Sequence, residues 1–474
     1  MTKYKEAIAT FICGVTVLIY FIVTLNNPYF NPKNFLNHIN TFTSSEYKGR
    51  LTGDIGAKKA SKYIQKEFKK NNISPLSNSN DYVQKFPLNN VHITGDISFK
   101  AYDARGNLFK EYLYGKDFKE VPFGMSSKGT VKGSVSTSIG EKSPILFFNQ
   151  NMIGESENDY ILDDILISND FKACIYTGND FFRFRTPYKL QKSYDKGLIK
   201  IMVNSKVSKE IPTLLKTGAT FEIKTGIENK NIYGENILGV IKGKDSLKPP
   251  IVLSAHYDHV GFDIDNVIYP GALDNASGIS FLMEAAKILK NSNPKRDIII
   301  AAFDAEEVGL LGSEYFASNS LVNIKKSKVI NFDMVGTTKN IPLSVLSSND
   351  NSLSKEVLNL MKKNNIKSSK LLESNSDHAS FESVGVDAVT LIHDDMDKIH
   401  TPLDTIENIN EEKIIDVFYT LKSFLTYNDI IDDKSFNIHT NSSKLNFYST
   451  YILLSFITLL FLNLLLYLRR KGWL

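Results

Sequence analysis

Short apolar runs in the second half of the chain each stop at histidine or carboxylate residues. The runs, with the residues near their ends, are 251–255 with His256, 298–303 with Glu306 and Glu307, and 329–332 with Asp333. Apolar runs of this length are typical of parallel strands buried on both faces. Because functional sites form at the carboxyl ends of strands in open α/β sheets, we expect these side chains to lie together.

The same chemical types recur at Asp274 and His400. Histidine nitrogen and carboxylate oxygen are ligands that suit zinc. Two histidines and three carboxylates can serve a pair of metal ions that share one bridging carboxylate, and a fourth carboxylate is left over as a base. The pattern predicts a metallohydrolase with two metal ions.

The composition is that of an ordinary folded protein. With 474 residues, of which 42% are hydrophobic, the chain is long enough for two or more domains. A formal net charge of +4 is too small to indicate a nucleic-acid partner. There are two cysteines, Cys13 and Cys174, and the first lies in an apolar segment, which excludes a disulfide framework.

Both ends of the sequence carry apolar segments, at 8–25 and 447–468. About 18–20 apolar residues suffice to cross a bilayer, so each segment predicts a transmembrane helix. The flanking positive residues are Lys3, Lys5, Arg469, Arg470 and Lys471. They predict a cell-membrane protein with cytoplasmic tails at 1–7 and 469–474 and everything between the helices outside. The alternatives are a cleaved signal peptide for the first segment and a buried core helix for the second.

Four regions are expected between these segments. They are 26–95 as the first part of an α/β domain, 96–232 as a β-rich insert, 233–427 as the main part of the domain, and 428–446 as a linker. The insert has frequent Gly, Ser and Thr and short alternating runs, but no ligand constellation, so we expect it to be structural or to limit access. The predicted fold class is α/β, with a mixed, mainly parallel sheet sandwiched by helices.

Six motifs, in order, resemble those of the M28 family of zinc aminopeptidases. They are SAHYDHVG (254–261), GALDNASG (271–278), FDAEEVGLLGS (303–313), NFDMVG (331–336), SDH (376–378) and IHTPLDT (399–405). Upstream, Gly49, Arg50, Gly53 and Gly56 resemble the entry to the same domain. The resemblance covers about 30–90 and 233–427 and implies a zinc exopeptidase-like fold, with the insert interpreted as similar to protease-associated domains.

The resemblance also implies a role for each site residue. It assigns His256 and Asp333 to one zinc, Glu307 and His400 to the other, Asp274 as the bridge, Glu306 as the general base, and Asp258 as the partner that orients His256. His259 is expected to be a neighbour of the site rather than a ligand, and His378 is a candidate for lining the substrate pocket. Ile399 stands where some family members have a tyrosine that assists the oxyanion.

The implied function is that of a membrane-anchored, extracytoplasmic aminopeptidase with two Zn²⁺ per chain. Its substrates would be peptides with a free N-terminus. The alternatives on the same fold are a glutaminyl cyclase, which typically uses one zinc, a carboxypeptidase-like relative, and an inactive receptor or scaffold. All five expected ligands and the expected base are present in the sequence, which favours the aminopeptidase. The sequence gives no indication of the oligomeric state.

Overall fold

The structure, a computed structural model, describes residues 29–77, 81–151, 157–178 and 196–438. Across these residues, no helix is both long enough and apolar enough to cross a membrane. The predicted transmembrane segments, 8–25 and 447–468, and the tails beyond them lie outside the described residues.

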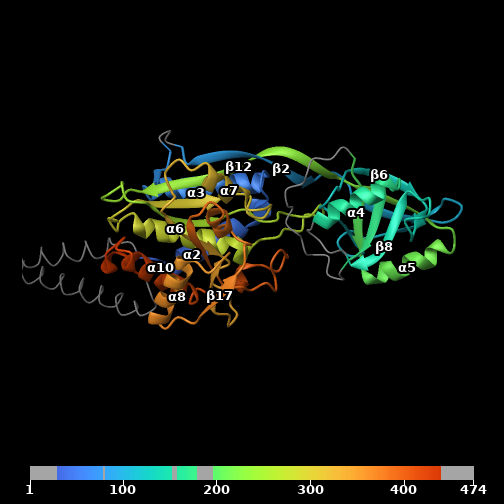
Figure 1. The fold of residues 1–474 in the computed structure, drawn as a ribbon. Helices are drawn as coiled ribbons and strands as arrows, with labels where there is room; N and C mark the ends of the chain where they lie inside the picture. Colours follow the sequence, from blue (N-terminus) through green and yellow to red (C-terminus); the bar gives the residue numbers. More distant parts are fainter. Residues whose placement is uncertain (1–28, 78–80, 152–156, 179–195, 439–474) are drawn as a thin grey trace, which may run out of the picture.

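A nine-stranded mixed sheet organises the larger part of the molecule (Figure 1). Its strands in spatial order are β1 (Ser74–Pro75), β12 (Ile227–Ile241), β14 (Ile298–Phe303), β13 (Ile251–His256), β15 (Lys328–Asp333), β18 (Asp387–Ile392), β16 (Leu343–Ser347) and β17 (Ser368–Leu372), and β2 (Val83–Ile93) also pairs with β12. The central strands β14, β13, β15 and β18 run parallel, whereas β12 and β16 pair antiparallel with their central neighbours. The expectation of a mainly parallel sheet holds for the four central strands and for the edge pair β16 and β17. The pairings of β12 and the pairing of β16 with β18 are antiparallel.

Helices cover both faces of this sheet. On one face lie α2 (Pro32–Thr43), α3 (Ile55–Lys70), α6 (Gly278–Leu289), α8 (Ser352–Lys363) and α10 (Ile414–Tyr427), and on the other lie α7 (Leu311–Ser318) and α9 (His378–Glu382). In β14, Ile298 and Ile300 belong to the core under the first group of helices, whereas Ile299 and Phe303 belong to the core under the second. Burial on both faces explains why the central strands appear in the sequence as uninterrupted apolar runs.

The burial patterns of two helices reflect what they pack against. In α3, the side chains of Ala60, Ile64 and Phe68 recur every four residues and are buried, as expected for one face of a helix. Helix α6 follows Asp274, and nearly all its residues are buried because it packs along the central strands.

The insert contains two further sheets. Their strands are β3 (Ser98–Tyr102), β4 (Leu108–Glu111), β6 (Gly129–Gly133) and β11 (Thr220–Thr225) in one, and β5 (Phe118–Glu120), β7 (Val135–Ser136), β8 (Ile145–Asn151), β9 (Ala173–Thr177) and β10 (Ile199–Val203) in the other. Two helices, α4 (Glu157–Ser168) and α5 (Ser205–Leu215), accompany them. The strands β8, β9 and β10 run parallel, so half of the insert is α/β rather than purely β-rich. The expected boundary between residues 232 and 233 falls inside the continuous strand β12.

The stretch expected to be a linker packs against the domain as far as residue 438. The side chains of Ile430, Ile431 and Phe436 are buried in its main core, and the Phe30 backbone N–H donates to the Asn437 carbonyl. These apolar side chains follow no helix or strand period, which is why the pattern resembled a linker. The remainder, 439–446, lies outside the described residues.

Candidate metal centre

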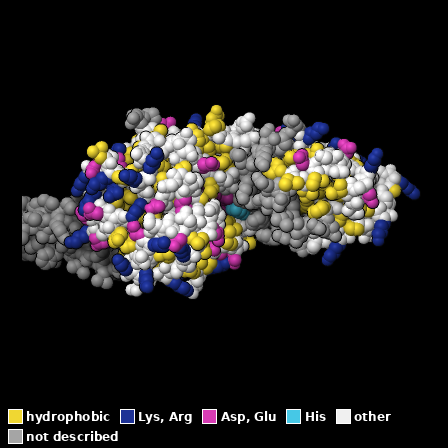
Figure 2. All heavy atoms as spheres, in the orientation of Figure 1, with side chains coloured by type: hydrophobic (Ala, Val, Ile, Leu, Met, Phe, Trp, Pro, Cys, Tyr) yellow, Lys and Arg dark blue, Asp and Glu magenta, His cyan; other side chains and the backbone are white. Residues whose placement is uncertain are grey.

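The structure brings all five predicted ligands to the carboxyl edge of the central strands. His256 and Asp333 are the last residues of β13 and β15, and Asp274 lies in the turn that leads into α6. Glu307 follows β14, and His400 follows β18. On the face drawn in Figure 2, histidine side-chain surface is visible at the junction between this part of the molecule and the insert.

The side chains form two groups, each compact enough for one ion. In the first, the Nε2 atom of His256 lies 3.4 Å from Oδ1 of Asp333 and 3.9 Å from Oε2 of Glu306. In the second, Nε2 of His400 lies 3.0 Å from Oε2 of Glu307. The potential ligand atoms within each group all lie within 4.8 Å of one another.

Asp274 faces both groups. Its Oδ1 atom lies 3.5 Å from Nε2 of His256, and its Oδ2 atom lies 3.1 Å from Nε2 of His400. A carboxylate that directs one oxygen at each of two ligand groups has the geometry of a bridge between two cations.

A buried oxygen atom without a hydrogen-bond donor indicates where a cation fits. Oδ1 of Asp333 is buried and accepts no hydrogen bond, whereas Oδ2 of the same carboxylate accepts one from the Ser376 hydroxyl at 2.8 Å. Buried polar atoms are nearly always paired in folded proteins. The free oxygen is the one that faces His256, so the donor set fits a metal ion such as zinc at this point.

A left-handed turn directly precedes the two adjacent glutamates. Ala305, just before them, has a φ of 62°, a conformation that non-glycine residues adopt rarely and mostly at functional sites. Beyond this turn, Glu306 lies with His256 and Asp333, whereas Glu307 lies with His400. The two adjacent glutamates thus belong to different groups of side chains.

The two glutamates have opposite electrostatic environments. Burial raises the pKa of the Glu306 carboxyl well above its usual value; the nearby carboxylates of Asp333 and Asp377 raise it further, and His256 opposes them. Burial also favours the protonated form of Glu307, but His400 and His259 outweigh it and hold the pKa of Glu307 well below its usual value. Such a difference in pKa between two neighbouring carboxyl groups is typical of a site in which one transfers protons and the other stays an anionic ligand.

Asp258 accepts hydrogen bonds from the backbone of Glu306 and Glu307 and also lies next to His256. It lies 3.5 Å from Nδ1 of His256, which is longer than a normal hydrogen bond. Its two oxygens accept from the backbone N–H groups of Glu306 and Glu307 at 3.1 and 3.3 Å. The Thr52 hydroxyl also donates to Asp258, at 3.2 Å.

Three residues outside the predicted ligands and base support the site. Nδ1 of His259 lies 2.7 Å from Oε1 of Glu307, which makes this histidine part of the second group. Asp404 accepts from the backbone N–H of Asp274 at 3.0 Å. The buried guanidinium of Arg50 donates to the carbonyls of Tyr257, Pro270 and Gly271. Asp404, His259 and Arg50 all lie in quoted motifs, so the motifs indicated their positions although not their contacts.

The suggestion that His378 lines the substrate pocket is not supported. Its side chain is buried, and its two ring nitrogens lie 2.9 Å from the Thr390 hydroxyl and 2.9 Å from the Glu373 carbonyl. With both nitrogens engaged inside the domain, His378 acts as a packing residue of the α9 region.

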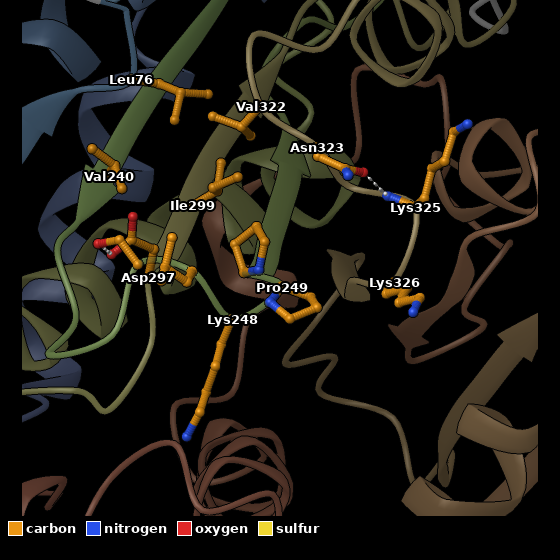
Figure 3. A pocket seen from close by; sticks show the side chains of 13 residues that line it. Leu76, Val240, Lys248, Pro249, Asp297, Ile299, Val322, Asn323, Lys325 and Lys326 are labelled. Atoms are coloured by element: carbon orange, nitrogen blue, oxygen red, sulfur yellow. Dashed lines mark hydrogen bonds between the residues drawn. The ribbon is translucent and has the colours of Figure 1, made fainter.

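A separate pocket of about 290 Å³ lies at the opposite ends of the central strands (Figure 3). The lysines Lys248, Lys325 and Lys326 line it together with aliphatic and proline side chains. Its carboxylate, Asp297, already accepts from the Gly243 N–H and the Ser246 hydroxyl, each at 2.8 Å. Because neither histidine nor cysteine is among its lining residues, this pocket does not compete as a metal centre.

Comparison with known proteins agrees with the position of the site. Residues 236–425 match the model of Peptidase family M28. The chain is 35% identical over 198 residues to aminopeptidase YwaD of Bacillus subtilis (strain 168), across 39% of this chain and 42% of YwaD. It is 36% identical over 108 residues to a probable zinc metalloprotease of Pyrenophora tritici-repentis (strain Pt-1C-BFP), across 22% of each chain. The chain thus spans less than half the length of these curated relatives.

The fold is similar to that of a solved structure. BSAP, a zinc aminopeptidase from Bacillus subtilis, superposes with a TM-score of 0.65 at 21% identity, over 86% of this chain and 98% of that one. The matched fold therefore includes the insert as well as the large sheet. Residues 236–425, which match the model of Peptidase family M28, contain all seven predicted site residues.

Proposed function

We propose that the protein is a di-zinc aminopeptidase that removes N-terminal residues from peptides. The observation that carries the proposal is the position of Asp274, whose two oxygens face two separate histidine-carboxylate groups. The match of residues 236–425 to the model of Peptidase family M28 and the names of the relatives support the choice of peptide bonds and zinc.

In this proposal, His256 and Asp333 would hold one zinc, Glu307 and His400 would hold the other, and Asp274 would supply one oxygen to each. A bound zinc pair lowers the pKa of a water molecule toward about 7 and polarises the carbonyl of the bond to be cleaved. Glu306 takes a proton from the attacking water and gives it to the amine that leaves.

The neighbouring residues keep these groups in place. Asp258 fixes the backbone of Glu306 and Glu307 and lies next to His256. It thereby keeps the proposed base and the proposed ligands at fixed positions relative to one another. Ile399, next to His400, has no hydroxyl to stabilise the oxyanion, which leaves that task to other donors and to the metals.

An assay with three matched peptides tests the proposal. The peptides share one sequence and carry a free N-terminal leucine, an acetylated leucine, or a free N-terminal glutamine. We expect the free-leucine peptide to release leucine and the acetylated peptide to stay intact. Cyclisation of the glutamine peptide without hydrolysis would instead favour a glutaminyl cyclase, and no reaction with any peptide would favour a scaffold.

We further propose that segments 8–25 and 447–468 anchor the protein in a cell membrane, with the peptidase domain outside and both ends in the cytoplasm. The length of the two apolar runs and the positive residues beyond them support this topology. If it is correct, carbonate washing leaves the protein in the membrane fraction and external protease cleaves the peptidase domain in intact cells; release by carbonate would contradict it.

A further inference from the structure

The loop between the predicted ligands His256 and Asp274 leaves the large sheet and reaches the insert. Its side chain Ile264 packs against the hydrophobic core of the insert. Two other residues of the loop, Asp263 and Tyr269, contact Lys119 of β5 in the insert. Figure 1 shows the insert beside the large sheet, with β2 and β12 leading toward it. The loop thus has the proposed metal site at its base and the insert at its outer end.

The contact with the insert is a closed triad of buried polar groups. Lys119 donates from Nζ to the Tyr269 hydroxyl at 2.8 Å and forms an ion pair with Oδ1 of Asp263 at 2.8 Å. The Tyr269 hydroxyl in turn donates to Oδ2 of Asp263 at 2.8 Å. The exposed fractions are 2% for Lys119 and 0% for Asp263 and Tyr269.

A buried triad of this kind indicates a fixed contact rather than a movable cover. Charged groups lose their hydration when they are buried, and the loss is balanced only while the partners stay in register. An insert that merely screened the site would be expected to meet its rim through exposed side chains. Here, separating the insert from the loop would expose Lys119 and Asp263 or leave one of them buried without its partner.

Backbone contacts also hold the base of the loop in place. A displacement of the tip of the loop is therefore transmitted to the predicted ligands at its two ends. The Gly261 N–H donates to the Gly49 carbonyl at 2.9 Å, and the Tyr269 N–H donates to the Gly261 carbonyl at 3.0 Å. At Gly49, where φ is +62°, a Cβ atom would lie 2.1 Å from the Gly261 carbonyl oxygen. The backbones therefore touch, and the loop has little room to absorb a displacement between Asp263 and His259.

We propose that the insert is a structural part of the metal site. Lys119 is a positioning residue that, through Asp263 and Tyr269, holds the loop whose two ends bear ligands of both zinc ions. This inference rests on the proposed di-zinc site. It gives a role in metal binding to the insert, although the insert contributes no metal ligand. Zinc affinity then depends on the docking of the insert.

The test is the zinc affinity of the full chain, measured by competition with a chelator. Lys119→Met removes the charge and keeps much of the length of the side chain. We expect it to weaken zinc binding at least about tenfold, the scale typical of groups that support metal ligands. Lys116→Met is the matched control, because Lys116 lies three residues earlier and is exposed. Its zinc affinity should equal that of the wild type.

Tyr269→Phe removes only the hydroxyl and provides a gentler variant. It should weaken zinc binding in the same direction by a smaller factor, and the double variant should lose less than the product of the two factors, since both remove the same triad. The increase in Tm on adding zinc should also become smaller in both variants, which a purely general loss of stability would not cause.

The outcomes separate this inference from the proposed function. If the wild type binds two zinc ions and both folded variants bind them with unchanged affinity, the role of the insert is wrong and the di-zinc site stands. If Lys119→Met does not fold, Tyr269→Phe decides, and unchanged affinity in that variant overturns the inference. A wild-type chain that binds no zinc would instead overturn the proposed function.

Discussion

Replacing Glu306 with glutamine is expected to lower kcat by about 10²–10⁴-fold while zinc stays bound. Glutamine has almost the same shape as glutamate but cannot accept the proton of the attacking water. Zinc remains because the ligand set, with His256 and Asp333 on the same side, does not require the fourth carboxylate. Steady-state kinetics on an unblocked peptide and metal analysis of the same sample give both quantities.

Glu314→Gln is the matched control for this variant. Glu314 lies in α7, is exposed, and undergoes the same chemical change eight positions further along the chain. It should keep wild-type kcat and wild-type zinc content. If Glu306→Gln retained full turnover, the assignment of Glu306 as the general base would be wrong.

Asp274→Ala is expected to lose both zinc and activity. Asp274 is the carboxylate that faces both ligand groups, so in the proposed site its removal would take one ligand from each ion. Because a bound metal pair contributes several kcal/mol to transition-state stabilisation, we expect kcat/KM to fall by about 10²–10³-fold or more. Metal analysis should give less than about one zinc per chain.

The control for this variant is Asp164→Ala, an exposed aspartate in α4 of the insert. Its zinc content and kcat/KM should match those of the wild type. An Asp274→Ala protein that retained its full zinc content would show that this carboxylate does not bridge, although it faces both histidines.

The central strands, and the gathering of the candidate ligands at their ends, could be predicted because both follow from the apolar pattern of the sequence. Strands buried on both faces must be apolar along their length, so a histidine or carboxylate at the end of one is conspicuous. The turn at Ala305 has no such signal in the apolar pattern of the sequence. Its left-handed φ became visible only in the structure.

The rest depends on contacts between distant segments. Lys119 and Tyr269 are 150 positions apart, and no local pattern signals that they meet. The role of His259 depends on a loop conformation that brings its ring to Glu307. Likewise, Ile430 and Phe436 are scattered apolar residues in a polar stretch, and only the packed domain shows that they belong to its core.

The zinc content of the purified full-length chain tests the central claim most directly. The protein would be purified without chelator, dialysed against metal-free buffer, and analysed for zinc alongside the Asp274→Ala variant. The account predicts about two zinc ions per wild-type chain and a clear loss in the variant. One zinc per wild-type chain, or none, would contradict the di-zinc site.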